Sequence, residues 1–143
     1  MLGTDAKANP EGFVQGFNDN AFHRYLGLQV AEQRIDYGRL RLQRNASTPT
    51  GIGGSVHGGV IATMIDMAAV VAVFSDLPDS GAPAGTADMA VTYLRQAHGT
   101  WVDAEASVIK RGRQLCTVEV SVVNDERVLC ARGRVLYAMR SGA

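Results

Sequence analysis

The 143-residue chain has few cysteines, few aromatic residues and no net charge. Its two cysteines, Cys116 and Cys130, fit neither a metal-binding spacing nor a disulfide framework. We interpret both as small buried side chains in a reducing compartment, so we expect a cytoplasmic protein. The 14 basic and 14 acidic residues balance. This balance argues against nucleic acid or an anionic membrane surface as the main partner.

The sequence also lacks an uninterrupted apolar segment long enough to span a membrane. Residues 57–75 approach the required length, but they contain His57 and Asp66, are diluted by alanine and glycine, and have no basic flanking anchors. A charge in the middle of a bilayer is costly. We therefore expect no membrane partner and no transmembrane span.

What the sequence does contain is a regular series of elements. Residues 1–12 are small and polar and predict a loose tail, whereas residues 13–140 predict a single domain. "NDNAFHRYLG" predicts a short helix that Asn18 to Asn20 cap and Gly27 stops. Leu28 to Val30 and the alternating "GRLRLQR" then predict a hairpin.

An apolar helix follows the loop "NASTPTGIGG" and ends near Phe74 or Ser75. After a loop over residues 75–85, the segments "TADMAVTYL", "TWVDAEASVIK", "QLCTVEVSVV" and "RVLCARGRVLYAM" alternate as strands do. Short turns between strands predict an antiparallel sheet. A helix buried against one face of such a sheet makes an α+β fold.

Both faces of the predicted helix are poor in charge. Its core stripe comprises Val60, Ile61, Met64, Ile65, Ala68, Val71 and Ala72. The opposite face comprises Gly59, Ala62, Thr63, Asp66, Ala69, Val70 and Val73. A helix that is apolar all round is buried all round, yet one sheet covers only one side. We therefore predict an obligate dimer or higher oligomer, in which a second copy packs about a two-fold axis.

Asp66 is the only charged residue in this apolar segment. Burying an ionised carboxylate without partners costs several kcal/mol or shifts its pKa upward. The helix supplies no Arg or Lys as a partner, and the small residues around Asp66 leave room for a ligand. A satisfied buried acid is the alternative, but perturbed acids cluster at functional sites, so we favour a functional role.

His57, Gly58 and Gly59 stand at the start of this helix. The first N–H groups of a helix have no partner inside it and lie at the positive end of its dipole. Two glycines let another molecule approach that backbone closely. Such a place suits an oxygen that becomes negative in a transition state. The alternative is that the two glycines only make a tight join between loop and helix.

These residues resemble the PaaI-type acyl-CoA thioesterases of the hotdog fold. "GSVHGGVIATMIDMAA" matches the family's glycine loop, H-G-G and Asp, and "GTADMAVTYLRQA" (85–97) resembles its next strand. The similarity extends from about Leu26 to Tyr137. It implies an antiparallel sheet of about five to six strands wrapped around one long central helix, and a dimer or a dimer of dimers, that is, a homotetramer.

The resemblance also implies a reaction, the hydrolysis of acyl-CoA to free acid and CoA at a dimer interface. Asp66 of one subunit would act as general base or as nucleophile, and the partner's Gly58 N–H would polarise the thioester carbonyl. Thr86 stands where the family has a water-positioning hydroxyl. Such a reaction needs an oxyanion stabiliser and a base, so we expect no metal and no cofactor. The three histidines and two cysteines form no convincing zinc set.

The chain departs from the family pattern at Gly51, where many members have an Asn six residues before the histidine. Thr50 or Ser55 would then substitute, or the reaction would be slower or altered. Gly59 is expected to line the substrate site. For His57 we favour a structural role, hydrogen bonding across the interface, over a role as base.

Four basic residues are candidates for the phosphates of CoA, because guanidinium forks and ammonium groups suit them. They are Arg95, Lys110, Arg111 and Arg113. The alternative is that they are ordinary solvated charges at turns and strand ends.

Two other functions are open. A hotdog hydratase or dehydratase acting on enoyl thioesters would pair a catalytic His with an acid, but no histidine lies beside Asp66 on its helix face. A non-catalytic acyl-CoA-binding module of the same fold is the second. The sequence does not indicate which acyl group is preferred.

Overall fold

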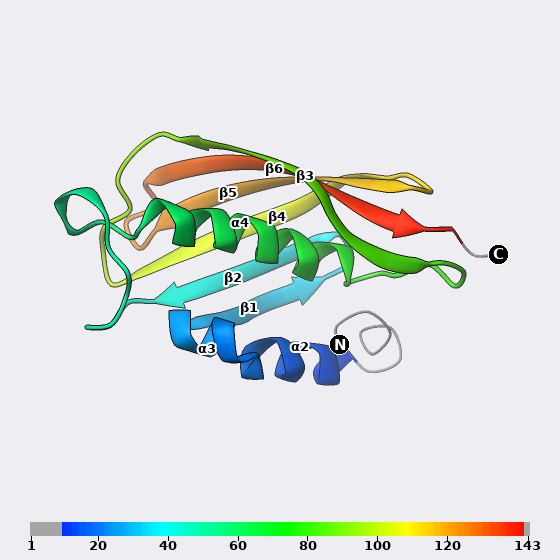
Figure 1. Ribbon diagram of the computed structural model, residues 1–143, viewed down its shortest axis with the longest axis horizontal. Helices are drawn as coiled ribbons and strands as arrows, with labels where there is room; N and C mark the ends of the chain where they lie inside the picture. Colours follow the sequence, from blue (N-terminus) through cyan, green and yellow to red (C-terminus); the bar gives the residue numbers. More distant parts are fainter. Residues whose placement is uncertain (1–9, 142–143) are drawn as a thin grey trace.

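The computed structural model describes residues 10–141. Figure 1 shows one curved sheet wrapped around the long helix α4, with two short helices, α2 and α3, beside the β1 edge. The six strands run in the order β1-β2-β4-β5-β6-β3, and each neighbouring pair is antiparallel. The predicted α+β arrangement, with an antiparallel sheet around one long central helix, is confirmed.

The bounds of the elements are as follows. The helices are α2 (Pro10–Asp19), α3 (Ala21–Leu26) and α4 (Gly58–Val73), with a short 3₁₀ turn at Ile52–Gly54. The strands are β1 (Leu28–Arg34), β2 (Tyr37–Gln43), β3 (Ala82–Tyr93), β4 (Trp101–Arg111), β5 (Leu115–Asn124) and β6 (Leu129–Arg140).

Helix α2 is a correction to the predicted tail at residues 1–12. Residues 1–9 lie outside the described residues, but the helix already begins at Pro10. Proline is favoured in the first turn of a helix. Phe13 and Phe17 are one turn apart, and they are 2% and 0% exposed. Phe13 also stacks on Phe74 at the end of α4, with ring centroids 5.3 Å apart, so this segment folds because it buries aromatic side chains.

The prediction of a short capped helix before the first hairpin is confirmed. The Asn20 side chain accepts hydrogen bonds from the N–H groups of Phe22 and His23 at the start of α3. Gly27 ends the helix in the left-handed conformation, with φ 75°. The chain then forms the β1–β2 hairpin.

The pairing of β3 differs from a simple run of hairpins. Short turns join β4, β5 and β6, but β3 pairs with β6 at the edge of the sheet, while β4 pairs with β2. Strand β3 also begins at Ala82, inside the segment predicted as loop. Pro83 is tolerated there because β3 is an edge strand and its register shifts between Pro83 and Gly85.

Helix α4 packs closely on the inner face of the sheet. A Cβ at Gly38 on β2 would lie 2.7 Å from a methyl group of Val71, so only glycine allows this approach. Cys116 and Cys130 are 2% and 1% exposed, as predicted, and burial raises the pKa of both thiols. Both cysteines therefore act as small apolar core residues. No helix among residues 10–141 is both long enough and apolar enough to span a bilayer.

The face of α4 that was predicted to need a second copy is partly covered by its own chain. Ala69, Val70 and Val73 are 0%, 5% and 0% exposed within the single chain, so the prediction was wrong for these three residues. Figure 1 shows that the chain leaves α4, turns and returns across its last turns as β3. The face left open lies nearer the start of the helix, where Gly59 is exposed and Ala62, Thr63 and Asp66 are half-buried.

Candidate functional site

The carboxylate of Asp66 lies on the open face of α4, next to β3. Its Oδ1 accepts a hydrogen bond of 2.6 Å from the hydroxyl of Thr86. None of the ion pairs among residues 10–141 includes Asp66. The structure thus brings together Asp66 and Thr86, and no cation of the described chain neutralises the acid.

Tyr137 is a neighbour of this acid that the sequence did not reveal. It lies on β6 directly opposite Thr86 in the β3–β6 ladder and is 5% exposed. Burial raises the pKa of the Tyr137 phenol, and the negative charge of Asp66 raises it further. The phenol is therefore neutral at physiological pH. Alternation in the last strand predicts only that Tyr137 faces the core.

His57 caps the start of α4. Its Nδ1 accepts a hydrogen bond of 2.9 Å from the N–H of Gly59. Because Nδ1 accepts, the proton of the neutral ring lies on Nε2. Within one chain His57 has a structural role, and the N–H of Gly59 is already used. A contact of His57 across an interface stays a prediction.

Other polar groups of the first helical turn are also held. The hydroxyl of Tyr93 donates to the carbonyl oxygen of Gly58 at 2.7 Å. The hydroxyl of Thr63 donates to the carbonyl oxygen of Gly59 at 3.0 Å. By contrast, the N–H of Gly58 has no hydrogen-bond acceptor among residues 10–141. This donor is therefore left for another molecule.

A cavity of about 480 Å³ opens beside Gly58. Its walls come from the loop before α4, the first turn of α4 and the segment after β3. The lining residues include five predicted site residues, namely Gly51, Ser55, His57, Gly58 and Arg95. The others are Ile52, Val56, Ile61, Tyr93, Leu94, Gln96, Ala97 and Cys130. The cavity therefore combines apolar walls with a free backbone donor.

Three of the predicted residues in this cavity have contacts of their own. The Ser55 hydroxyl donates to the carbonyl of Ile52 at 2.7 Å, and the Gly51 N–H donates to the carbonyl of Ser55 at 2.7 Å. Both bonds hold the turn before α4. Arg95 donates to the carbonyl of Leu129 at 3.1 Å. Thr50 lies just outside, where it forms a single β-bridge with Val56.

The predicted CoA-binding Arg111 is engaged elsewhere. Its Nε forms an ion pair of 2.6 Å with Asp36. Its Nη2 donates to the carbonyls of Ala72 and Val73, at 3.2 and 3.1 Å, which are among the last carbonyls of α4. A guanidinium there satisfies carbonyls that the helix leaves without partners. Arg111 therefore stabilises the C-terminal end of α4.

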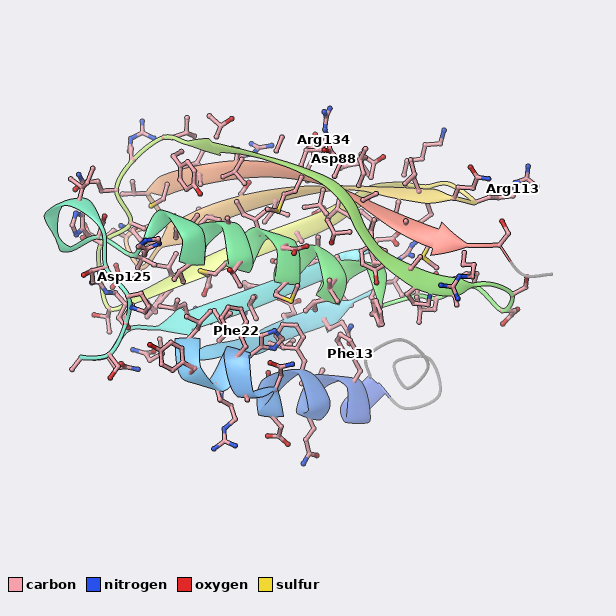
Figure 2. The ribbon with its side chains drawn as sticks, in the orientation of Figure 1. Phe13, Phe22, Asp88, Arg113, Asp125 and Arg134 are labelled. Atoms are coloured by element: carbon pink, nitrogen blue, oxygen red, sulfur yellow. The ribbon has the colours of Figure 1, made fainter. Side chains whose placement is uncertain are left out.

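The other basic candidates do not converge with Arg95. Lys110 is an exposed residue near the end of β4. Arg113 lies in the β4–β5 turn, and Figure 2 shows it at the end of the molecule opposite the start of α4. It lines a separate cavity of about 510 Å³. The role of all four basic residues in binding phosphates stays a prediction.

No group of three or more His, Cys, Asp or Glu residues between positions 10 and 141 is arranged to hold a metal ion. The prediction that the reaction needs no cofactor is not tested by this geometry. The groups that the site does offer are the carboxylate of Asp66, the hydroxyl of Thr86, the imidazole of His57 and the N–H of Gly58.

Comparison with known proteins shows relatives of this chain. Residues 53–131 match the family model described as the thioesterase superfamily. A Halobacterium salinarum protein that carries an esterase name is 38% identical over 127 residues, covering 86% of this chain and 83% of the relative. The medium/long-chain acyl-CoA thioesterase YigI of Escherichia coli is 27% identical over 129 residues, covering 81% and 83%.

A solved structure has the same fold as this chain. A mutant of the phenylacetic acid degradation protein PaaI from Thermus thermophilus has a TM-score of 0.72 and 22% identity to this chain, covering 83% of this chain and 98% of that one. This likeness confirms the hotdog fold, and the family match together with the YigI relative confirms the resemblance to thioesterases of this type. Since the family match covers more than half of the chain and relatives such as YigI are acyl-CoA thioesterases, this chain belongs to the thioesterase superfamily and is a thioester hydrolase.

Proposed function

We propose that the protein hydrolyses acyl-CoA to a free acid and CoA at a site shared by two copies of the chain. One observation carries the proposal. Gly58 and Asp66 are eight residues apart on α4, which places them about 12 Å apart along the helix axis. A reacting carbonyl must lie about 3 Å from its oxyanion donor and within reach of the base or nucleophile. One chain thus holds two half-sites.

A second copy packed on the open face of α4 brings unlike half-sites together. If two α4 helices cross near Ala62 about a two-fold axis, the partner's Gly58 lies opposite Asp66, and the reverse holds for the second site. Gly59, Ala62 and Thr63 are small, so they permit a close helix–helix approach. This arrangement requires a dimer, and a dimer of dimers would contain the same pair of sites.

The proposed chemistry uses the Gly58 N–H of one copy and the Asp66 carboxylate of the other. The thioester oxygen accepts a hydrogen bond from the partner's Gly58 N–H at the positive end of the helix dipole, where the oxyanion develops. Asp66 removes a proton from the attacking water, or attacks the carbonyl itself to give a mixed anhydride that water then hydrolyses. The C–S bond breaks, the CoA thiolate takes up a proton, and the products are the acid and CoA.

Thr86 has a clear place in this scheme. Its hydroxyl proton is donated to Oδ1 of Asp66, so the oxygen of Thr86 retains lone pairs that accept a hydrogen bond from the attacking water. The water is then held between the hydroxyl and the carboxylate. The acyl-CoA names of relatives such as YigI, and the partly apolar cavity beside Gly58, support an acyl-CoA substrate.

Mixed dimers test whether the site is shared. Asp66→Asn and Gly58→Pro chains with different affinity tags are co-expressed, and the hybrid is purified by both tags. Each variant alone has two defective sites, but the hybrid has one site with neither change. We expect about half of the wild-type CoA release per hybrid dimer, against about 1% or less for each parent. A purified hybrid as inactive as its parents would show that the two residues do not act across an interface.

Gly51→Asn is expected to increase the rate. A Cβ at Gly51 would lie 3.7 Å from the Cα of His57, so a side chain fits there without a clash. A carboxamide in this cavity adds a second donor for the thioester oxygen, and because one such donor is worth about 10²–10³ in rate in other hydrolases, we expect kcat to rise about tenfold. Gly51→Ala is the matched control, since it fills the same space without a donor. An Asn variant no faster than the Ala variant would contradict the prediction.

A further inference from the structure

Strand β3 contacts both half-sites through hydroxyl groups. Thr86, near its start, donates to Asp66, and Tyr93, at its end, donates to the carbonyl oxygen of Gly58 at 2.7 Å. Tyr93 lies in the segment "GTADMAVTYLRQA" (85–97) that resembles the family, and the reaction proposed above does not use it. Its side chain is in contact with α4 although the residue is 55% exposed.

The hydrogen bond from Tyr93 acts on the first residue of the helix, where the backbone has the least support from side chains and from intrahelical bonds. Gly58 and Gly59 have no side chains, and the first N–H groups of a helix are not held by intrahelical bonds. Tyr93 holds the carbonyl end of the Gly58–Gly59 peptide, and Nδ1 of His57 holds its N–H end. Both ends of one peptide group are therefore fixed.

The ring of Tyr93 adds a packing contact. A Cβ built at Gly58 would lie 3.6 Å from two ring carbons of Tyr93, so the ring covers the bare side of this glycine. Hydroxyl and ring together restrict the backbone of Gly58, and with it the direction of the one N–H in this turn that has no acceptor within residues 10–141.

We infer that Tyr93 is a positioning residue for the oxyanion donor, acting through the backbone of Gly58. The inference rests on the proposed function. A donor aligned in advance stabilises the charge that develops in the transition state, and the weaker ground-state interaction changes little. Loss of the Tyr93 hydroxyl therefore lowers kcat with little change in KM.

Tyr93→Phe is the test, because it removes the hydroxyl and keeps the ring. We expect kcat for acyl-CoA hydrolysis to fall about tenfold and KM to stay within about twofold. The affinity for a non-hydrolysable CoA thioether, measured by calorimetry, stays unchanged. The control is Tyr25→Phe, an exposed tyrosine on α3 that is 67% exposed, and it keeps the wild-type kcat.

Three results would overturn the inference. The first is a Tyr93→Phe enzyme with wild-type kcat. The second is an equal loss in kcat and in the fraction of chains that bind the thioether, together with a lower Tm, which indicates a general role in folding. The third is a rise in KM that accounts for the whole effect. A failure of the proposed function gives a different result, because acyl-CoA hydrolysis would then persist in the Asp66→Asn variant.

Discussion

Asp66→Asn is expected to reduce kcat for thioester hydrolysis by at least about a hundredfold. An amide neither removes a proton from water nor attacks the carbonyl. The change is nearly isosteric, and the amide oxygen still accepts the hydrogen bond from Thr86. No ion pair within residues 10–141 is lost, because none includes Asp66. We therefore expect a folded protein that lacks activity, measured as CoA release from an acyl-CoA.

Asp88→Asn is the matched control for this substitution. Asp88 lies on the same strand as Thr86, is exposed, and is labelled in Figure 2. The same change of one carboxylate to an amide there is expected to leave kcat and Tm at their wild-type values. Hydrolysis at an unchanged rate in Asp66→Asn would remove Asp66 from the mechanism.

Gly58→Pro is expected to have a comparable effect for a different reason. Proline has no N–H, so the substitution removes the proposed oxyanion donor, and loss of one such donor lowers kcat by about 10²–10³. Gly58 is the first residue of α4, a position that proline favours. His57 has ψ 135°, which suits a residue before proline. Helix and fold should therefore persist, as circular dichroism and Tm will show.

Gly58→Ala separates the loss of the donor from the addition of atoms. Alanine keeps the N–H, and its Cβ would lie 3.6 Å from the ring of Tyr93, an ordinary contact. We expect its kcat to stay well above that of Gly58→Pro, by about tenfold or more. If Gly58→Ala and Gly58→Pro lose activity equally, the loss is due to added atoms beside the substrate and cannot be attributed to the missing N–H.

Much of the secondary structure could be predicted from local patterns. Helix α4 ends at Val73 with Phe74 as its cap, as the pattern predicts, because an apolar period of 3.6 and its flanking glycines are properties of neighbouring residues. The alternation of "QLCTVEVSVV" likewise predicts β5, and its inward residues Cys116, Val118, Val120 and Val122 are all buried. Helix α2 was missed, since its two buried phenylalanines are too few to show a clear period.

The site was predicted only in part. His57 and Gly58 stand out at the start of an apolar helix, Asp66 stands out as the only charged residue within it, and Thr86 was identified from the resemblance. Tyr93 and Tyr137 were missed, although they contact Gly58 and lie near Asp66. They come from strands 35 and 71 residues further along the chain than those partners. No local pattern indicates such a pairing.

The amino-acid order was sufficient to predict the long helix and the alternating strands, and to single out the acid and the glycines for which we propose a role in the reaction. These depend on conformational preferences and on side chains a few residues apart. The placement of β3 beside β6, the covering of Ala69, Val70 and Val73 by the chain itself, and the contact of Tyr93 with the helix start emerged from the folded molecule. They depend on which distant surfaces bury most apolar area together, a property of the whole packed core that no single segment contains.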